Sequence, residues 1–288
     1  MRSGPRALMS IAREAGGNWR STMATEQSHR FVAAQPPQAT AGSEEISSDR
    51  LAAMIEPFDS YWQAPKDIEK GYDSFAAYYR VNYLPWMPAD RKARVLVISC
   101  GPGYLVDVLV KAGYENVLGI DSMQEKVDFA VRKGLACRTE RAFEFLAAPG
   151  EPFDVIIPEQ ELNHLTHVEM QQFLRLCRRR LKPGGSLIVY GLNGANPFVG
   201  SENLAHNIDH FNTFTEYSLT QILELAGFEH IEPQPLKVYV FYRNPLNYVG
   251  WAITASFELF FRVMFKLYGK DVKILTKKIA ATCRNPAL

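Results

Sequence analysis

The sequence predicts an α/β fold built around a parallel β-sheet, and two features of the chain support this prediction. Short apolar runs rich in β-branched residues alternate with longer segments whose apolar residues recur at helical spacing. A Gly-Pro-Gly turn directly follows the first apolar run, at residues 101–103. Parallel strands joined by helices cross over in the right-handed sense, and such sheets bind ligands at the carboxyl ends of their strands.

Each predicted strand is a short apolar run, and each predicted helix has an apolar face and an identifiable end. The strands lie at 94–99, 117–120, 153–157 and 186–190. The helices lie at 105–112, 123–133, 143–148, 168–181 and 216–226. Gly113 and Gly227 end two of these helices, and a Pro-Gly-Gly turn separates the fourth helix from the strand that follows it.

Two more strands are predicted near the carboxyl terminus, at 237–242 and 278–283, with a helical insertion at 244–272 between them. The uncharged run from 244 to 257 is shorter than the roughly 20 apolar residues that a membrane span needs. Glu258, Arg262 and Lys266 then recur every four residues, which predicts an amphipathic helix. Three interpretations stay open: a lid packed over the site, a peripheral membrane contact through residues 245–268, or a homodimer contact.

The amino-terminal part of the chain divides into two segments. Residues 1–45 are rich in arginine and in small polar residues, which predicts a mobile tail. This tail is interpreted either as an organelle transit peptide or as a segment that precedes a natural start near Met23. Residues 46–93 are rich in aromatic residues and predict a helical cap, which Pro85 and Pro88 bring to an end. Its tyrosines are expected either to pack on the core or to line a ligand cleft.

The composition excludes several classes of protein. Of 288 residues, 47% are hydrophobic and 22% are charged, which is unlike a disordered chain, collagen or a polytopic membrane protein. The net charge of +1 gives no global field that would select nucleic acid, so we expect no nucleic-acid partner. Four widely spaced cysteines favour a reducing, cytoplasmic compartment, and we expect neither a zinc site nor any other metal site.

The glycine turn and Asp121 together predict a nucleoside site. Glycines allow a ligand to approach the backbone closely, and the start of a helix offers free N–H groups. Asp121 ends the second strand, where its carboxylate can accept hydrogen bonds from both ribose hydroxyls. The Gly-Lys-Ser/Thr of a P-loop is missing, and Val106 replaces the third glycine of a dinucleotide fingerprint. An adenosine-type ligand is therefore expected.

Six short motifs occur in order with suitable spacing: VLVISCGPG, GID, FDVI, LNHL, LKPGG and AGF. In this order they resemble the class I S-adenosylmethionine-dependent methyltransferases, over a stretch from about residue 61 to the end. The segment NGANPFVG with His210 and FTEYSL is most similar to methyltransferases of cell-surface polysaccharide gene clusters. The resemblance implies a Rossmann-like, seven-stranded, mostly parallel sheet with an antiparallel last strand, spanning residues 94–288.

The resemblance also implies S-adenosyl-L-methionine as cofactor and assigns residues to it. The residues expected around its methionine part are Ser99, Cys100, Gly101 and Gly103, with Pro158 and Glu159 near the methyl group. Asp121 is expected to hold the ribose. The residues expected beside the adenine are Ser122, Met123, Ala142 and Phe143.

Four positions depart from the family pattern, namely Val97, Ser99, Arg141 and Asn163. Val97 replaces an acidic residue, Ser99 replaces the first glycine, Arg141 stands where an acid often binds adenine, and Asn163 replaces a glutamate. We expect Ser99 to keep the tight turn only if its φ is negative. These departures make a non-catalytic methyltransferase fold, acting as a binding or scaffold subunit, the main alternative to an enzyme.

The expected reaction is O-methylation of a sugar or another hydroxyl of a small-molecule or glycan acceptor. Methylation of an apolar natural product is a further alternative, suggested by the aromatic cap and the insertion. A hydroxyl acceptor benefits from a base, and histidine titrates near neutrality. Two histidines, His164 and His210, follow the fourth and fifth predicted strands and are the candidate catalytic residues. Asp209 precedes His210 and is expected to orient or charge its imidazole.

Overall fold

The structure is a computed structural model that describes residues 68–159, 162–206, 210–237 and 245–287. Contacts between Cα atoms divide the chain into units 1–47 and 48–288. All described residues belong to the second unit. The predicted tail at 1–45 and the first part of the predicted cap lie outside them.

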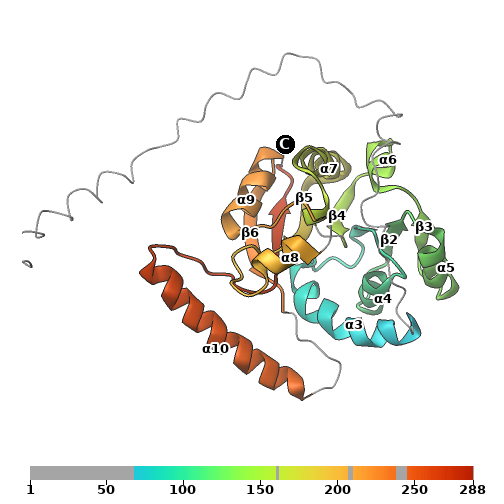
Figure 1. Ribbon diagram of the computed structural model, residues 1–288. Helices are drawn as coiled ribbons and strands as arrows, with labels where there is room; N and C mark the ends of the chain where they lie inside the picture. Colours follow the sequence, from blue (N-terminus) through green and yellow to red (C-terminus); the bar gives the residue numbers. More distant parts are fainter. Residues whose placement is uncertain (1–67, 160–161, 207–209, 238–244, 288) are drawn as a thin grey trace, which may run out of the picture. The chain divides into compact units, whose positions relative to one another are not determined.

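A seven-stranded sheet with the order β3-β2-β1-β4-β5-β7-β6 forms the centre of the second unit (Figure 1). The strands are β1 (Arg94–Ile98), β2 (Asn116–Asp121), β3 (Cys137–Thr139), β4 (Phe153–Pro158), β5 (Leu181–Leu192), β6 (Glu229–Pro235) and β7 (Lys278–Arg284). Only β7 runs antiparallel to its neighbours in this sheet. The predicted sheet, mostly parallel with an antiparallel last strand, is therefore confirmed.

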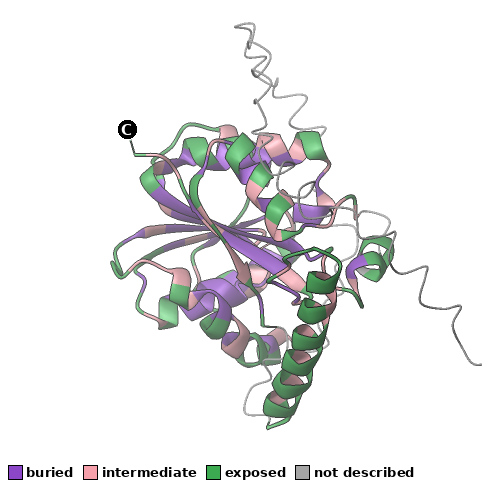
Figure 2. Ribbon diagram, turned by 90° about the vertical axis from the view of Figure 1, so that its left-hand side faces the viewer, coloured by how far each residue is buried: buried purple, intermediate pink, exposed green. Residues whose placement is uncertain are grey.

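The sheet is buried between helices on both of its faces, as the burial colours of Figure 2 show. The helices are α3 (Ile68–Asn82), α4 (Tyr104–Lys111), α5 (Gln124–Arg132), α6 (Ala142–Ala147), α7 (His167–Arg180), α8 (Gly200–His206), α9 (Glu216–Leu225) and α10 (Leu246–Leu267), with short 3₁₀ turns at Leu84–Trp86 and Leu162–His164. Every side chain of β1 from Val95 to Ile98 is fully buried. This explains why a strand covered on both faces is a continuous apolar run rather than an alternating one.

Several tyrosines of α3 and of the residues just after it pack on the core, whereas Phe75 is exposed. Tyr72, Tyr79 and Tyr83 are buried, and the Tyr72 ring meets the Tyr104 ring of α4 edge to face at 4.8 Å. The Tyr72 hydroxyl donates to the carbonyl of Pro102 at 2.6 Å. The described part of the cap is thus a helix laid against α4 and against the glycine turn.

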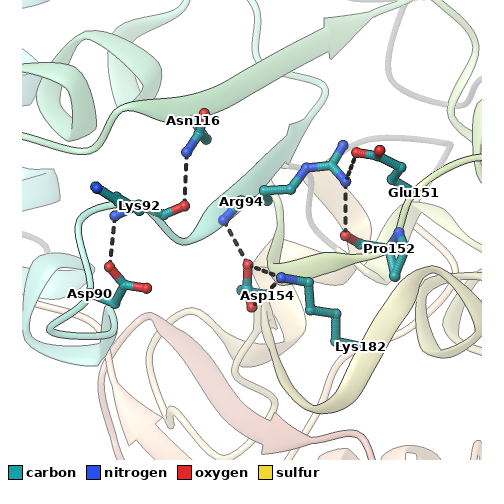
Figure 3. Close-up of polar contacts among 8 residues, drawn as sticks. All are labelled: Asp90, Lys92, Arg94, Asn116, Glu151, Pro152, Asp154 and Lys182. Atoms are coloured by element: carbon teal, nitrogen blue, oxygen red, sulfur yellow. Dashed lines mark hydrogen bonds and ion pairs between the residues drawn. The ribbon is translucent and has the colours of Figure 1, made fainter.

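The amino ends of three strands are tied together by Asp154, at the edge opposite the glycine turn (Figure 3). Its carboxylate accepts from the Arg94 backbone N–H at 2.8 Å and from the Lys182 ammonium at 2.8 and 2.9 Å. Lys182 belongs to β5, which begins at Leu181 rather than at the predicted residue 186. The Pro-Gly-Gly turn is a bulge within this strand, because the register with β4 shifts there and Gly184 has a φ of +73°.

The sixth strand of the sheet lies at Glu229–Pro235, which the sequence did not predict. Of the predicted strand at 237–242, Lys237 lies outside any strand, and the rest lies outside the described residues. The strand contains Pro233 and Pro235, and proline has no backbone N–H to donate to a neighbouring strand. The sequence pattern therefore did not indicate a strand here. The two prolines are tolerated because β6 lies at the edge of the sheet and pairs only with β7. The short elements β3 and α8 were also missed.

The insertion before β7 contains α10, in agreement with the predicted helix at 244–272. None of its residues is buried. Within the described residues, no helix has both the length and the apolarity that crossing a membrane requires. The segment between α10 and β7 is held beside the end of β5 by the fully buried Asn193, whose amide donates to the carbonyls of Ile274 at 3.0 Å and Thr276 at 2.9 Å.

Candidate functional site

The turn after β1 has an unusual backbone. Ser99, Gly101 and Gly103 have φ values of +54°, +55° and +83°. A Cβ on Gly103 would lie 2.8 Å from the Leu135 side chain, so this position requires glycine. A Cβ on Gly101 would meet nothing within 4 Å, so open space lies beside its backbone. The turn therefore presents bare backbone toward a space that a ligand can enter.

The expectation for Ser99 was wrong, since its φ is positive. A left-handed conformation costs a residue with a Cβ roughly 1–2 kcal/mol. The backbone here follows the path that glycine adopts without strain, and this explains why the family pattern has glycine at this position. The neighbouring Cys100 side chain points into the core, where Gly119 allows it to lie close to Cys137.

Asp121 joins the turn after β1 to the turn after β2. Its carboxylate accepts from the Gly101 backbone N–H at 2.8 Å and from the Met123 backbone N–H at 3.0 Å. The Lys126 ammonium lies 3.9 Å from the same carboxylate, and both side chains are buried. A carboxylate offers about four lone-pair positions, so it can accept several hydrogen bonds at once.

The residues expected beside an adenine lie in two positions. Ser122 and Met123 are partly buried in the turn after β2. Ala142 and Phe143 begin α6 and are both buried, and the Phe143 ring packs against Phe173 at 5.7 Å. The Phe143 ring is therefore a core side chain.

Pro158 and Glu159 end β4, and Glu159 has the most perturbed carboxylate of the site. The Tyr79 hydroxyl donates to its carboxylate, and the Tyr190 hydroxyl donates to its backbone carbonyl at 2.9 Å. Burial raises the pKa of Glu159 to about 7, although the hydrogen bond from Tyr79 and the charge of Lys278 act in the opposite direction. This carboxyl group is thus half ionised near neutral pH, which is typical of functional sites.

His164 and His210 are brought together, although 46 positions separate them in the chain. Their ring centroids lie 4.6 Å apart and their planes meet at 78°. The backbone carbonyl of Asn163 joins their loops by accepting from Phe211 N at 2.8 Å. Asp209 lies outside the described residues. The pair lies on loops that follow β4 and β5, at the ligand-binding edge of the sheet.

Two of the four departures from the family pattern occupy fully buried positions. Val97 lies in the middle of β1, between Gly119 and Ile157 of the adjacent strands. The side-chain oxygen and nitrogen of Asn163 have no hydrogen-bond partner in the described part of the chain. A buried amide without partners costs about 1–3 kcal/mol, so Asn163 is an unexplained feature close to the histidine pair.

A cavity of about 600 Å³ lies between α10 and the carboxyl edge of the sheet, and the sequence did not reveal it. Its lining is mostly apolar and includes Phe198, Lys237, Trp251, Phe257, Phe261 and Lys277. The next residue after Lys277 extends toward Glu159, since the Lys278 ammonium lies 5.2 Å from the centre of the Tyr190 ring. Lys278 and Tyr190 thus lie beside Glu159 at the end of β4. No group of three His, Cys, Asp or Glu residues among the described positions could hold a metal ion.

Comparison with known proteins gives a consistent result. The family described as "Methyltransferase domain" matches residues 72–232, which is more than half of the chain. The ubiquinone biosynthesis O-methyltransferase of Cereibacter sphaeroides is 33% identical over 181 residues, covering 56% of this chain and 68% of that protein. The enzyme of the same name from a Chelativorans strain is 31% identical over 130 residues, covering 41% of this chain but only 50% of that protein.

A solved structure shows the same fold. The crystal structure of a SAM-dependent methyltransferase from Archaeoglobus fulgidus superposes with a TM-score of 0.53, covering 73% of this chain and 92% of that chain. The two sequences are 20% identical, so this likeness concerns the fold alone.

Replacing Ser99 by glycine is expected to stabilise the protein. Glycine removes the strain at φ +54°, and the gain exceeds the entropy that glycine adds to the unfolded chain. Urea denaturation should show a free energy of unfolding about 1 kcal/mol higher than in the parent protein. Ser99→Ala is the matched control, because alanine keeps the Cβ. An equal gain in both variants would contradict the assignment of strain.

Proposed function

The chain belongs to the methyltransferase-domain family, and from this premise we propose that it is an O-methyltransferase acting on a hydroxyl of a small acceptor with an apolar body. The observation that carries the proposal is the Asp121 carboxylate, buried at the end of β2 and bonded to the amide of the open Gly101 turn. The methyl donor of the family is S-adenosyl-L-methionine.

The residues present fit this donor. The open space beside Gly101 admits a ligand close to the backbone, and the neighbouring Asp121 carboxylate is a group that accepts hydrogen bonds of the kind ribose hydroxyls donate. Ser122 and Met123 would border the adenine, while Ser99, Gly101 and Gly103 would border the methionine part, together with the backbone of Cys100. When bound, the donor supplies a methyl group on a sulfonium, which is already strongly electrophilic. The protein therefore has to align the acceptor and exclude water.

Glu159 supports a further role in this proposal. It stands at the end of β4, beside Pro158, where the family resemblance puts the methyl group. Its carboxyl group is ionised above about pH 7 and neutral below it. An ionised carboxylate favours a cationic sulfonium over the neutral thioether of the demethylated product. Discrimination between donor and product should therefore strengthen as the pH rises.

We expect the ratio of S-adenosylmethionine affinity to S-adenosylhomocysteine affinity to rise up to about tenfold between pH 6 and pH 8, as Glu159 ionises. Isothermal titration calorimetry with both ligands measures it. Glu159→Gln keeps an acceptor for Tyr79 but cannot ionise, so its ratio should follow only the ligands' own titration. If the affinity ratio changed with pH in the same way in both proteins, the placement of Glu159 near the methyl group would be contradicted.

His210 is proposed as the base that takes the proton of the acceptor hydroxyl, and His164 as the residue that positions it. The edge-to-face contact at 4.6 Å limits the orientation of both rings. Histidine suits the task because its ordinary pKa lies near the working pH.

His210→Ala should lower kcat/KM about 100-fold, since general base catalysis is worth roughly 10²–10⁴-fold. The Kd for S-adenosylhomocysteine should change less than twofold, because the proposed cofactor contacts come from other loops. His206→Ala is the matched control, as His206 is an exposed histidine of α8 paired with Glu202. Equal losses of binding and turnover in His210→Ala would exclude a role as base.

The acceptor is proposed to be apolar because the cavity beside α10 is lined mostly by aromatic and aliphatic side chains. The names of the two relatives place those enzymes in ubiquinone biosynthesis, and ubiquinone is a quinone with an isoprenoid chain. This differs from the sugar acceptor that the sequence led us to expect. A polysaccharide-type sugar therefore becomes the competing acceptor in the test.

Methyl transfer from labelled donor should favour a catechol that carries an isoprenoid chain over the same catechol without the chain, and over free hexoses. Each CH₂ buried in an apolar site contributes about 0.8 kcal/mol, so two buried groups already give more than tenfold in kcat/KM. Phe261→Ala, within the cavity, should reduce this preference, whereas the exposed Phe75→Ala should not. Preferential methylation of a hexose would overturn the apolar acceptor.

A non-catalytic binding subunit is the second candidate, and the buried Val97 and the unpartnered amide of Asn163 favour it. The calorimetric experiment separates the two candidates, because a fold that has lost its donor site should bind neither ligand.

A further inference from the structure

The helix α10 exposes an apolar surface on the side that faces away from the sheet. Its inner side is marked by partly buried residues, and Phe257 and Phe261 meet the Phe198 ring edge to face at 5.2 and 5.1 Å. The opposite side, here called the outer face, consists of Val249, Leu259, Phe260, Val263 and Leu267. Each of these side chains is more than half exposed.

No described residue covers this outer face, since none of the 22 residues of α10 is buried. Contiguous apolar surface is rare on monomeric proteins and marks a binding surface for a partner or for a lipid. An ordinary surface helix would carry charged residues there. On α10 the charged residues Glu258 and Arg262 instead pair with each other at 3.4 Å, away from the outer face.

The charge of the segment points to an anionic partner. Residues 246–278 contain six basic side chains, Arg262, Lys266, Lys270, Lys273, Lys277 and Lys278, against the two acidic residues Glu258 and Asp271. Lys266, Lys270, Lys273 and Lys277 are exposed. Tyrosines stand near both ends of the helix, with Tyr248 72% and Tyr268 79% exposed. Tyrosine is enriched where one end of a side chain is apolar and the other is wet.

We propose that α10 lies in the interface of an anionic lipid bilayer, with its outer face toward the acyl chains. Lys266 and the lysines that follow the helix would then face the headgroups. A bilayer suits this helix better than a second copy of the chain does. The basic excess has a counterpart on an anionic surface, whereas the same helix of a second copy offers only Glu258, already paired with Arg262. Amphipathic helices with lysine and aromatic residues bind membranes in this way.

The inference does not depend on the proposed reaction. It nevertheless gives an apolar acceptor dissolved in the bilayer a short path to the cavity, because the inner side of the same helix lines the cavity. Both ends of the insertion join the sheet at the carboxyl ends of its parallel strands, since Pro235 pairs with Ile279 near the start of β7. A bilayer against α10 would thus lie beside the cavity.

The test is sedimentation of the purified full-length protein with vesicles of phosphatidylcholine alone or with one quarter phosphatidylglycerol, with neither donor nor acceptor present. Binding is expected to the anionic vesicles and to fall as salt is raised, because surface charges are screened. Absence of binding to anionic vesicles would overturn the inference. Calorimetry with S-adenosylmethionine on the same sample tests the proposed function separately. Failure to bind vesicles is therefore distinguishable from failure to bind the donor.

The variants separate the apolar from the charged contribution. Leu259→Ser, Phe260→Ser and Val263→Ser combined should reduce vesicle binding at least tenfold. Val168→Ser, Tyr217→Ser and Leu225→Ser form the matched control, because these exposed apolar residues lie on α7 and α9. Lys266→Gln, Lys270→Gln and Lys273→Gln should weaken binding to anionic vesicles roughly fivefold for each charge removed.

Two further measurements keep the test decisive. Circular dichroism and S-adenosylhomocysteine binding verify that the variants are folded, since the substituted residues are exposed. Light scattering of the parent protein and of the outer-face variant detects self-association. A dimer that dissociates in the outer-face variant would overturn the inference in favour of a second copy, as would equal loss of vesicle binding in the outer-face and control variants.

Discussion

The buried carboxylate of Asp121 is the interaction on which the site depends. A carboxylate removed from water is tolerated only when it is hydrogen-bonded and compensated, and here two backbone amides and the Lys126 ammonium supply those contacts. Because the amides belong to the turns after β1 and β2, the same bonds fix the relative position of both turns. The positive φ at Ser99 persists for this reason: the surrounding bonds determine the path of the turn, and the strain of one residue is smaller than the cost of breaking them.

The sequence predicted the sheet well because buried parallel strands have a strong and simple pattern. It failed where that pattern is weak: β3 has three residues, α8 has seven, and β6 carries two prolines that an edge position tolerates. At the site, strand order explains why candidate residues were expected at one edge. Contacts between distant loops, such as His164 with His210, have no periodic signal, and neither does the packing of the Phe143 ring into the core. The φ of Ser99 was mispredicted because it depends on the hydrogen bonds of Asp121, which no local rule describes.

The features along the carboxyl edge of the sheet differ in how they combine charge and apolarity. The turns after β1 and β2 offer backbone and a carboxylate, the end of β4 offers an ionisable group in a tyrosine cluster, and the cavity beside α10 is mostly apolar. Tyr190 and Lys278 lie beside Glu159, at the end of β4. This gradient from polar to apolar supports the proposed reaction between a polar nucleoside donor and an apolar acceptor. It also accounts for the position of α10, whose inner side completes the apolar end.

Two of the departures from the family pattern, Val97 and Ser99, have a structural explanation in the described residues. Val97 lies in β1 between two neighbouring strands. A carboxylate at this buried position would need hydrogen-bond partners, whereas valine packs there without any. Ser99 costs strain but leaves the backbone path of glycine unchanged. Since the electrophile is supplied ready-made by the donor, methyl transfer requires alignment and removal of a proton rather than a particular motif residue. A lost hydrogen bond of about 1.4 kcal/mol weakens donor binding about tenfold, which a cell compensates by donor concentration without any change in the reaction.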